Sequence, residues 1–115
     1  MFLLIKHYEN YIDFAPTPFT SELDEIRKLI DCKTIDIVTR SFKTFNIPNK
    51  KFCFIVDDEG LLNNKPLTLR SMHTCESIVG DMLICSIADD DIIGLSKFEL
   101  EELIKHFIIY GGLYD

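Results

Sequence analysis

The clearest pattern along the chain is a series of short apolar runs separated by polar turns. Residues 52 to 56 read Phe-Cys-Phe-Ile-Val, and three acidic residues and Gly60 follow them. An apolar run of this length, rich in aromatic and β-branched residues and closed by a turn, is typical of a buried strand entering a hairpin. Residues 82 to 87 form a second such run, and Gly80 and Asp81 before them permit a turn or bulge. We expect a buried strand at each run.

Three further segments have strand-like patterns. Residues 2 to 8 begin with four apolar residues and predict the first strand. Residues 11 to 14 either extend it or form a second short strand. The prolines at 16 and 18 are expected to stop regular structure there, because proline fixes φ and removes a backbone donor. Residues 34 to 39 alternate in polarity, so they predict a strand with a buried face.

Two amphipathic segments predict helices. The first begins at Ser21, with Asp24 three residues later in a weaker form of the capping box, and runs for about three turns. The second begins at a full capping box formed by Ser96 and Glu99. The apolar residues of each helix share one face: Leu23, Ile26, Leu29 and Ile30 in the first, and Leu100, Leu103, Ile104 and Phe107 in the second.

This order of elements predicts one α+β domain over residues 1–115. Short turns between strands favour a mostly antiparallel β-sheet with two helices packed on it, and we expect both helices on the same face. The length of 115 residues suits a single domain, and the hydrophobic fraction of 47% is typical of a folded one.

The charge balance narrows the classes of partner that the protein could bind. The chain has 12 Lys and Arg against 19 Asp and Glu, a net charge of −7. Nucleic-acid binding relies on cations that neutralise phosphates, so this balance argues against it. No apolar run reaches the length of a membrane helix, and the first residues lack the basic start and cleavage site of a signal peptide. We therefore expect a cytoplasmic protein without a membrane partner.

Motifs for established chemistry are missing from the sequence. It contains no phosphate-binding glycine loop, hydrolase elbow or zinc-binding helix. The four cysteines are widely spaced, and Cys53 and Cys85 fall in predicted strands, where they are expected to be reduced core residues. The acidic turn at 57 to 59 could hold a divalent cation, but a solvated turn is the simpler interpretation. We expect no enzymatic activity, no metal and no cofactor.

A polar loop offers the best candidate ligand site. Thr68, Arg70 and His73 lie close together in the sequence, and an arginine fork suits a phosphate group. Arg40 is a second candidate cation. A catalytic pair of His73 and Cys75 is disfavoured, because residues so close in sequence rarely present both groups to each other. The apolar run at 107 to 110 suggests a homodimer contact.

Four short motifs lie at residues 56 to 62, 65 to 67 and 78 to 84, and at the Gly-Leu-Ser of 94 to 96 with Glu99. Together they resemble the DUF3846 domain, a family of unknown function. The resemblance covers about residues 22 to 107. It departs at residues 31 to 33, where the family often has a glycine pair, and at Thr68, where the family has Asn. Because this family occurs in phages, plasmids and their bacterial hosts, the resemblance implies an accessory protein of a mobile element.

Our leading hypothesis is a non-enzymatic binding protein of a phage or mobile element. It would hold a small phosphate-bearing ligand, such as a nucleotide signal, through Arg40, Thr68, Arg70 and His73. One alternative is an acidic inhibitor that binds a host protein. Another is a small metal-dependent hydrolase built on the acidic turn.

Overall fold

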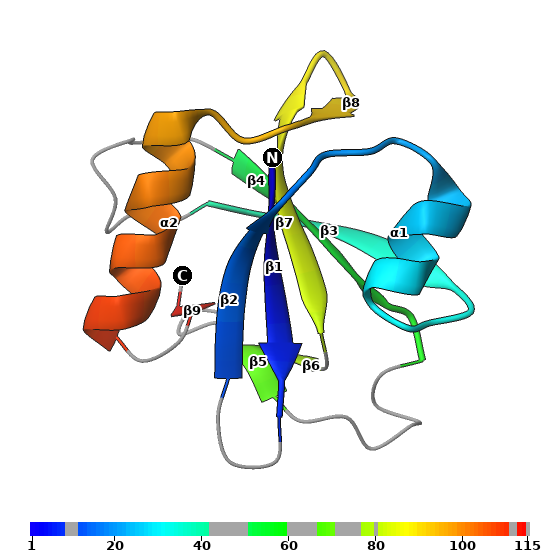
Figure 1. The fold of residues 1–115 in the computed structure, drawn as a ribbon, viewed down its shortest axis with the longest axis horizontal. Helices are drawn as coiled ribbons and strands as arrows, with labels where there is room; N and C mark the ends of the chain where they lie inside the picture. Colours follow the sequence, from blue (N-terminus) through cyan, green and yellow to red (C-terminus); the bar gives the residue numbers. More distant parts are fainter. Residues whose placement is uncertain are drawn as a thin grey trace.

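A six-stranded β-sheet runs through the centre of the computed structural model, with one helix on each side (Figure 1). The structure describes residues 1–8, 12–41, 51–59, 67–70, 77–79, 81–110 and 113–114, and side chains within 1–6, 8, 13–39, 51–59 and 81–109. The helices are α1 (Leu23–Leu29) and α2 (Lys97–Tyr110). Within these residues, no helix combines the length and the apolar character that crossing a membrane requires.

All pairings in this sheet are antiparallel, which confirms the predicted α+β class. Its strands lie in the order β2 (Ile12–Thr17), β1 (Phe2–His7), β7 (Met82–Ala88), β4 (Lys51–Asp57) and β3 (Ile35–Ser41). β8 (Asp91–Ile93) pairs with residues 86 to 88 of β7. A second, small sheet contains β6 (Ser77–Val79), β5 (Leu67–Arg70) and β9 (Leu113–Tyr114).

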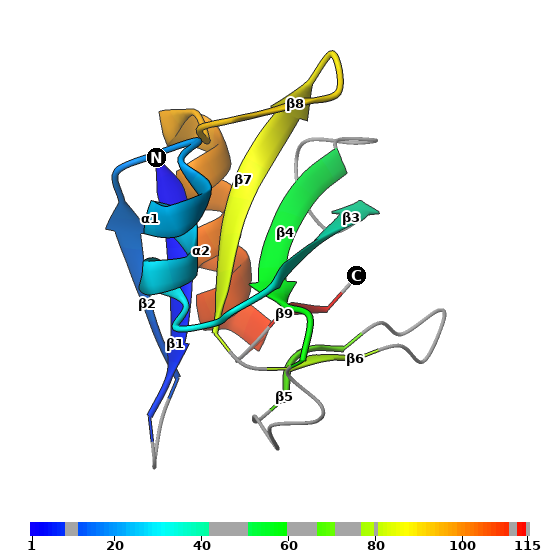
Figure 2. The same cartoon turned by 90° about the vertical axis from the view of Figure 1, so that its right-hand side faces the viewer.

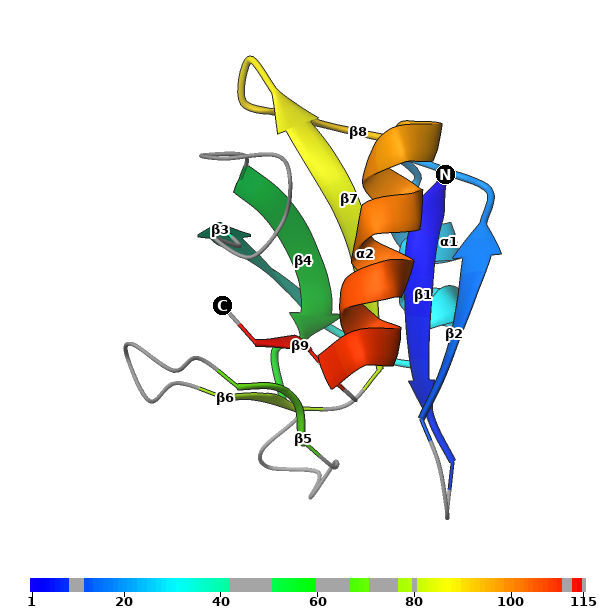
Figure 3. The same ribbon diagram turned by 90° about the vertical axis from the view of Figure 1, so that its left-hand side faces the viewer.

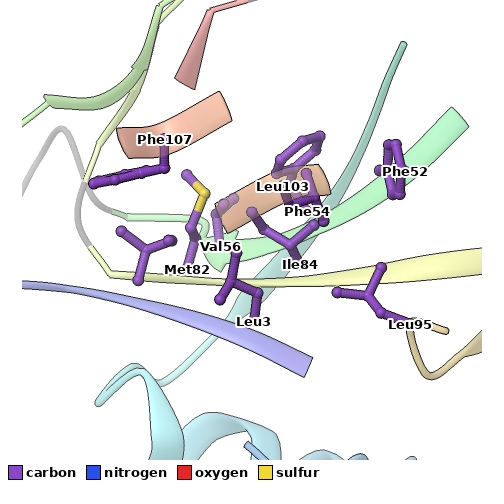
Figure 4. Close-up of a cluster of buried hydrophobic side chains, with 10 residues drawn as sticks. Leu3, Phe52, Phe54, Val56, Met82, Ile84, Leu95, Leu103 and Phe107 are labelled. Atoms are coloured by element: carbon purple, nitrogen blue, oxygen red, sulfur yellow. The ribbon is translucent and has the colours of Figure 1, made fainter. Parts of the chain in front are cut away.

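The two helices cover opposite faces of the large sheet, so the expectation that they share one face is wrong (Figures 2 and 3). On one face, Phe54 of β4 belongs to a buried cluster with Leu103 of α2 (Figure 4). On the other face, Ile55 of β4 belongs to a cluster with Ile26 of α1. Successive residues of a strand point to opposite faces. Because both faces of the central strands are apolar, each helix buries its own apolar side there.

β2 continues through a proline that was expected to end it. Pro16 lies opposite Leu3 in the pairing of β2 with β1, and the strand reaches Thr17. β2 is an edge strand, so its outer side needs no ladder hydrogen bond. An edge strand tolerates proline for this reason.

The predicted capping box of α1 is wrong in detail. The helix begins at Leu23, and its N-cap Glu22 makes no side-chain capping hydrogen bond. Thr20 forms a different link before the helix: its Oγ1 accepts a hydrogen bond from the Glu22 N–H at 3.1 Å and donates to Glu25 Oε2 at 2.8 Å. The helix has seven residues, about two turns rather than three.

The start of α2 agrees with its prediction. Ser96 N–H donates to Glu99 Oε1 at 2.9 Å, and Glu99 N–H donates to Ser96 Oγ at 3.1 Å, which completes a reciprocal capping box. The predicted apolar stripe is core: Leu103 and Phe107 are buried, with Leu100 and Ile104 packed against them. Beyond it, Ile108 and Ile109 are 66% and 61% exposed. The homodimer contact expected at this end of α2 stays a prediction.

β7 and β8 form a tight hairpin that the sequence analysis missed. Asp89 and Asp90 form its two-residue loop, with φ values of 50° and 68°. Positive φ at both loop positions belongs to the type I′ turn, whose twist matches the flanking strands. After β8, Gly94 lies against the first residue: a Cβ at Gly94 would come 2.7 Å from the backbone nitrogen of Met1. This close approach leaves room only for glycine.

Candidate functional site

The small sheet carries two of the four predicted ligand residues. Thr68 and Arg70 lie on β5, which is its middle strand, so the expectation that these two residues lie in a loop is wrong. Arg70 is opposite Ser77 on β6 and Tyr114 on β9. The register of β5 and β6 shifts between Leu67 and Leu69, so Thr68 lies at an irregularity of the β-bulge kind. Bulges redirect side chains and occur often beside binding sites.

The small sheet lies at the Asp57 end of β4. Figures 2 and 3 both show the arrowhead of β4 beside β5 and β9. Contacts between β4 and β6 join the two sheets. The small sheet, which carries Thr68 and Arg70, is therefore supported by the most buried strand of the large sheet.

The four predicted residues are not all brought together within one chain. Arg40 lies opposite Phe52, near the start of β4, whereas β5 lies near the end of that strand. Phe52 and Asp57 are five residues apart, which corresponds to about 17 Å along an extended strand. The structure describes Arg40, Thr68 and Arg70 by their backbones, and His73 and Cys75 lie outside the described residues. Their roles stay predictions.

The acidic turn at the end of β4 has a structural use. Asp57 is buried, and its Oδ1 accepts a hydrogen bond from the Glu59 N–H at 2.9 Å. Asp58 N–H donates to the Thr34 carbonyl at 3.0 Å, which holds the turn against the start of β3. Asp58 and Glu59 themselves are exposed. Across the described ranges, no three His, Cys, Asp or Glu side chains are grouped to hold a metal ion.

Two cysteines face each other in the core beneath α1. Cys53 and Cys85 lie directly opposite on β4 and β7, and both are free, buried thiols, as predicted for core residues. Burial, together with the neighbouring Cys53, raises the pKa of Cys85 to about 12. Burial also raises the pKa of Cys53, despite hydrogen bonds to Thr39 and Cys85 that lower it. Since the thiolate is the reactive form, these thiols are poor nucleophiles at neutral pH.

A buried polar link joins β7 to the start of α2. Ser86 has no exposed surface, and its Oγ donates to Glu99 Oε2 at 3.3 Å. The same carboxylate closes the capping box through its other oxygen. Sequence reasoning missed this link, although Ser86 continues the alternation that places Met82 and Ile84 on the α2 face. Glu99 therefore positions the helix on the sheet.

Comparison with known proteins identifies one family. A family model described as a domain of unknown function, DUF3846, matches residues 4–108 of the chain. The match includes the region of residues 22 to 107 in which the motifs were noted. No curated protein and no solved structure matches the chain significantly.

Proposed function

The chain belongs to the DUF3846 family, whose function is unknown, and from this premise we propose a non-enzymatic binding protein of phage or mobile-element origin. It acts in the cytoplasm and holds a small phosphate-bearing ligand on the small sheet. Thr68 and Arg70 are its main ligand residues, His73 follows them in the adjoining segment, and Arg40 is a further candidate.

The observation that carries this proposal is the position of Thr68 and Arg70 on one strand. β5 is flanked on both sides by other strands, so its backbone is held at a fixed place. An arginine presented from a fixed strand loses less freedom when it binds, and its planar fork of donors fits phosphate oxygens. A threonine hydroxyl two positions away supplies a neutral donor.

The buried polar groups of the large sheet support the same location for the site. Asp57 stabilises a turn and Ser86 bonds to the helix cap, so these groups serve the fold. The paired thiols of Cys53 and Cys85 are protonated core residues. Because these buried groups stabilise the fold, we propose the ligand surface on the small sheet instead.

Native mass spectrometry tests the proposal most directly. The protein is purified from its own host and from a neutral host, and a co-purifying mass of a few hundred daltons is the expected result. Arg70→Ala, and Thr68→Val separately, should lose that mass while remaining folded by circular dichroism. Lys28→Ala, which removes an exposed cation on α1, is the matched control and should keep it. Retention of the ligand by both site variants would reject the site.

A protein-binding inhibitor is the second candidate, favoured by the surface charge. Among the described side chains, exposed carboxylates clearly outnumber exposed cations. Three consecutive carboxylates, at residues 89 to 91, are exposed around the β7–β8 turn. Such a surface suits a basic host protein, and its binding should weaken strongly with salt. Affinity capture from host extract at low and high salt tests this, and salt-insensitive or absent capture would reject it.

A further inference from the structure

The large sheet has two edges of different character. β2 forms one edge and contains Pro16, which has no backbone N–H to offer a further strand. β3 forms the other edge, is seven residues long and contains no proline. Within the residues that the structure describes, β4 is the only strand paired with β3 (Figure 2). An edge of this kind is a template for another strand.

Hydrogen bonds show which groups of β3 face outward. Asp58 N–H donates to the Thr34 carbonyl. The backbone N–H and C=O groups of residue 34, and of the even-numbered positions after it, therefore point toward β4. The odd-numbered positions 35, 37, 39 and 41 direct their backbone groups to the open side. Consistent with this, Ile37 N–H donates to the Asp36 carboxylate at 2.9 Å rather than to a strand. Ile37 is also 50% exposed, although it is a large apolar residue in the middle of a strand.

We infer that β3 pairs antiparallel with β3 of a second copy of this chain, with Val38 opposite Val38. In this register Ile37 lies opposite Thr39 of the second copy, and both positions direct their backbone groups outward, as a ladder requires. Asp36 lies opposite Arg40 of the second copy, and symmetry repeats this pair on the other side of the axis. All seven residues of β3 take part.

The charges select this register among its neighbours. A ladder joining outward-facing positions permits only shifts that keep odd residues opposite odd residues. Each register is named by the residue that lies opposite its own copy on the two-fold axis. The registers centred on Asp36 and on Arg40 place like charges directly opposite each other, which is destabilising. The registers centred on Ile37 and on Thr39 leave both charges without an oppositely charged partner. Only the register centred on Val38 places Asp36 opposite Arg40, and this self-complementary pair of charges is the reason to assign the edge to a second copy.

Charge reversal tests this pairing. Sedimentation velocity over a wide concentration range should show a species of twice 13.3 kDa for the unaltered chain. Asp36→Arg places two cations opposite each other, and Arg40→Asp places two carboxylates opposite each other. Each should raise the dimer dissociation constant by at least about tenfold, because the pair occurs twice in the dimer. The double variant carrying both changes should restore dimerisation.

Matched controls distinguish the loss of this interface from an effect of net charge and from misfolding. Glu101→Arg and Lys105→Asp make the same charge changes at exposed positions of α2 and should leave the dimer unchanged. Thermal unfolding followed by circular dichroism identifies any variant that does not fold, and the remaining variants then decide. A species of 13.3 kDa at every concentration would overturn the inference, and so would a dimer that both reversals leave intact.

The same variants distinguish this inference from the proposed ligand site. Arg40 is a candidate in both, and the double variant restores the pairing while leaving an acid at position 40. If the double variant recovers the dimer but not ligand binding, Arg40 has a role both in the β3 pairing and in the ligand site. The Arg70 variants address the ligand alone, because β5 belongs to the small sheet.

Discussion

Replacing Phe54 with alanine should remove a large part of the stability of this protein. Phe54 has no exposed surface and lies in β4, between Val38 of β3 and Ile84 of β7. A buried phenylalanine withdraws about 200 Å² from water, which corresponds to about 5 kcal/mol at about 25 cal/mol per Å². Substitutions of this kind cost about 3–5 kcal/mol. We expect a loss of about 4 kcal/mol, against a total of about 5–15 kcal/mol for a typical domain.

Urea denaturation followed by circular dichroism measures this loss as a shift of the midpoint at constant slope. Phe98→Ala is the matched control, because Phe98 is 53% exposed at the start of α2. It should change the free energy of unfolding by no more than about 0.5 kcal/mol. If Phe54→Ala costs less than about 1 kcal/mol, or no more than the control, the assignment of Phe54 to the main core is wrong.

Three further predictions follow from local contacts. Ser96→Ala removes the cap of α2 and should lower the free energy of unfolding in urea by about 1 kcal/mol. Ser21→Ala, at the predicted capping position that α1 does not use, should lower it by less than about 0.5 kcal/mol. Equal losses would contradict the observed caps. Gly94→Ala forces a Cβ to 2.7 Å from the Met1 nitrogen and should lower the melting temperature, at a cost of about 1–3 kcal/mol; an unchanged melting temperature would argue against this close packing. Because burial raises the pKa of Cys85 from 9.0 to about 12, the unfolded chain loses this proton first. Stability should be level below pH 9 and then fall by up to about 1.4 kcal/mol per pH unit until the pKa of the folded state is reached, and a Cys85→Ala variant with the same alkaline slope would contradict this.

Several predictions that depend on neighbouring residues were confirmed, although the capping box predicted for α1 was not. The capping box of Ser96 and Glu99 joins residues three positions apart, so the sequence already contains both partners. The buried strands at residues 51 to 57 and 82 to 88 follow from apolar runs whose length and composition suit only a covered strand. For the same reason the apolar stripe of α2 was recognisable before its partners were known.

Some errors had a signal in the sequence that was not used. The run from Phe52 to Val56 is apolar at every position, which indicates that both faces of this strand are covered. This signal could have placed the helices on opposite faces. The loop of Asp89 and Asp90 between apolar residues is a recognisable hairpin signal, since Asp tolerates positive φ better than most residues. The extension of β2 through Pro16 carried no such signal, because it depends on the position of the strand at an edge.

By itself, therefore, the sequence determined the buried strands, the two helices and the α+β class, because each depends on contacts within a few residues, whereas the short strand β8 was not anticipated. Only the tertiary structure decided the strand order, the face that each helix covers and the meeting of Cys53 with Cys85. It also separated Arg40 from the small sheet and left β3 at an edge. These features depend on how distant segments pack to bury apolar surface together, and this collective free energy is not contained in any one segment.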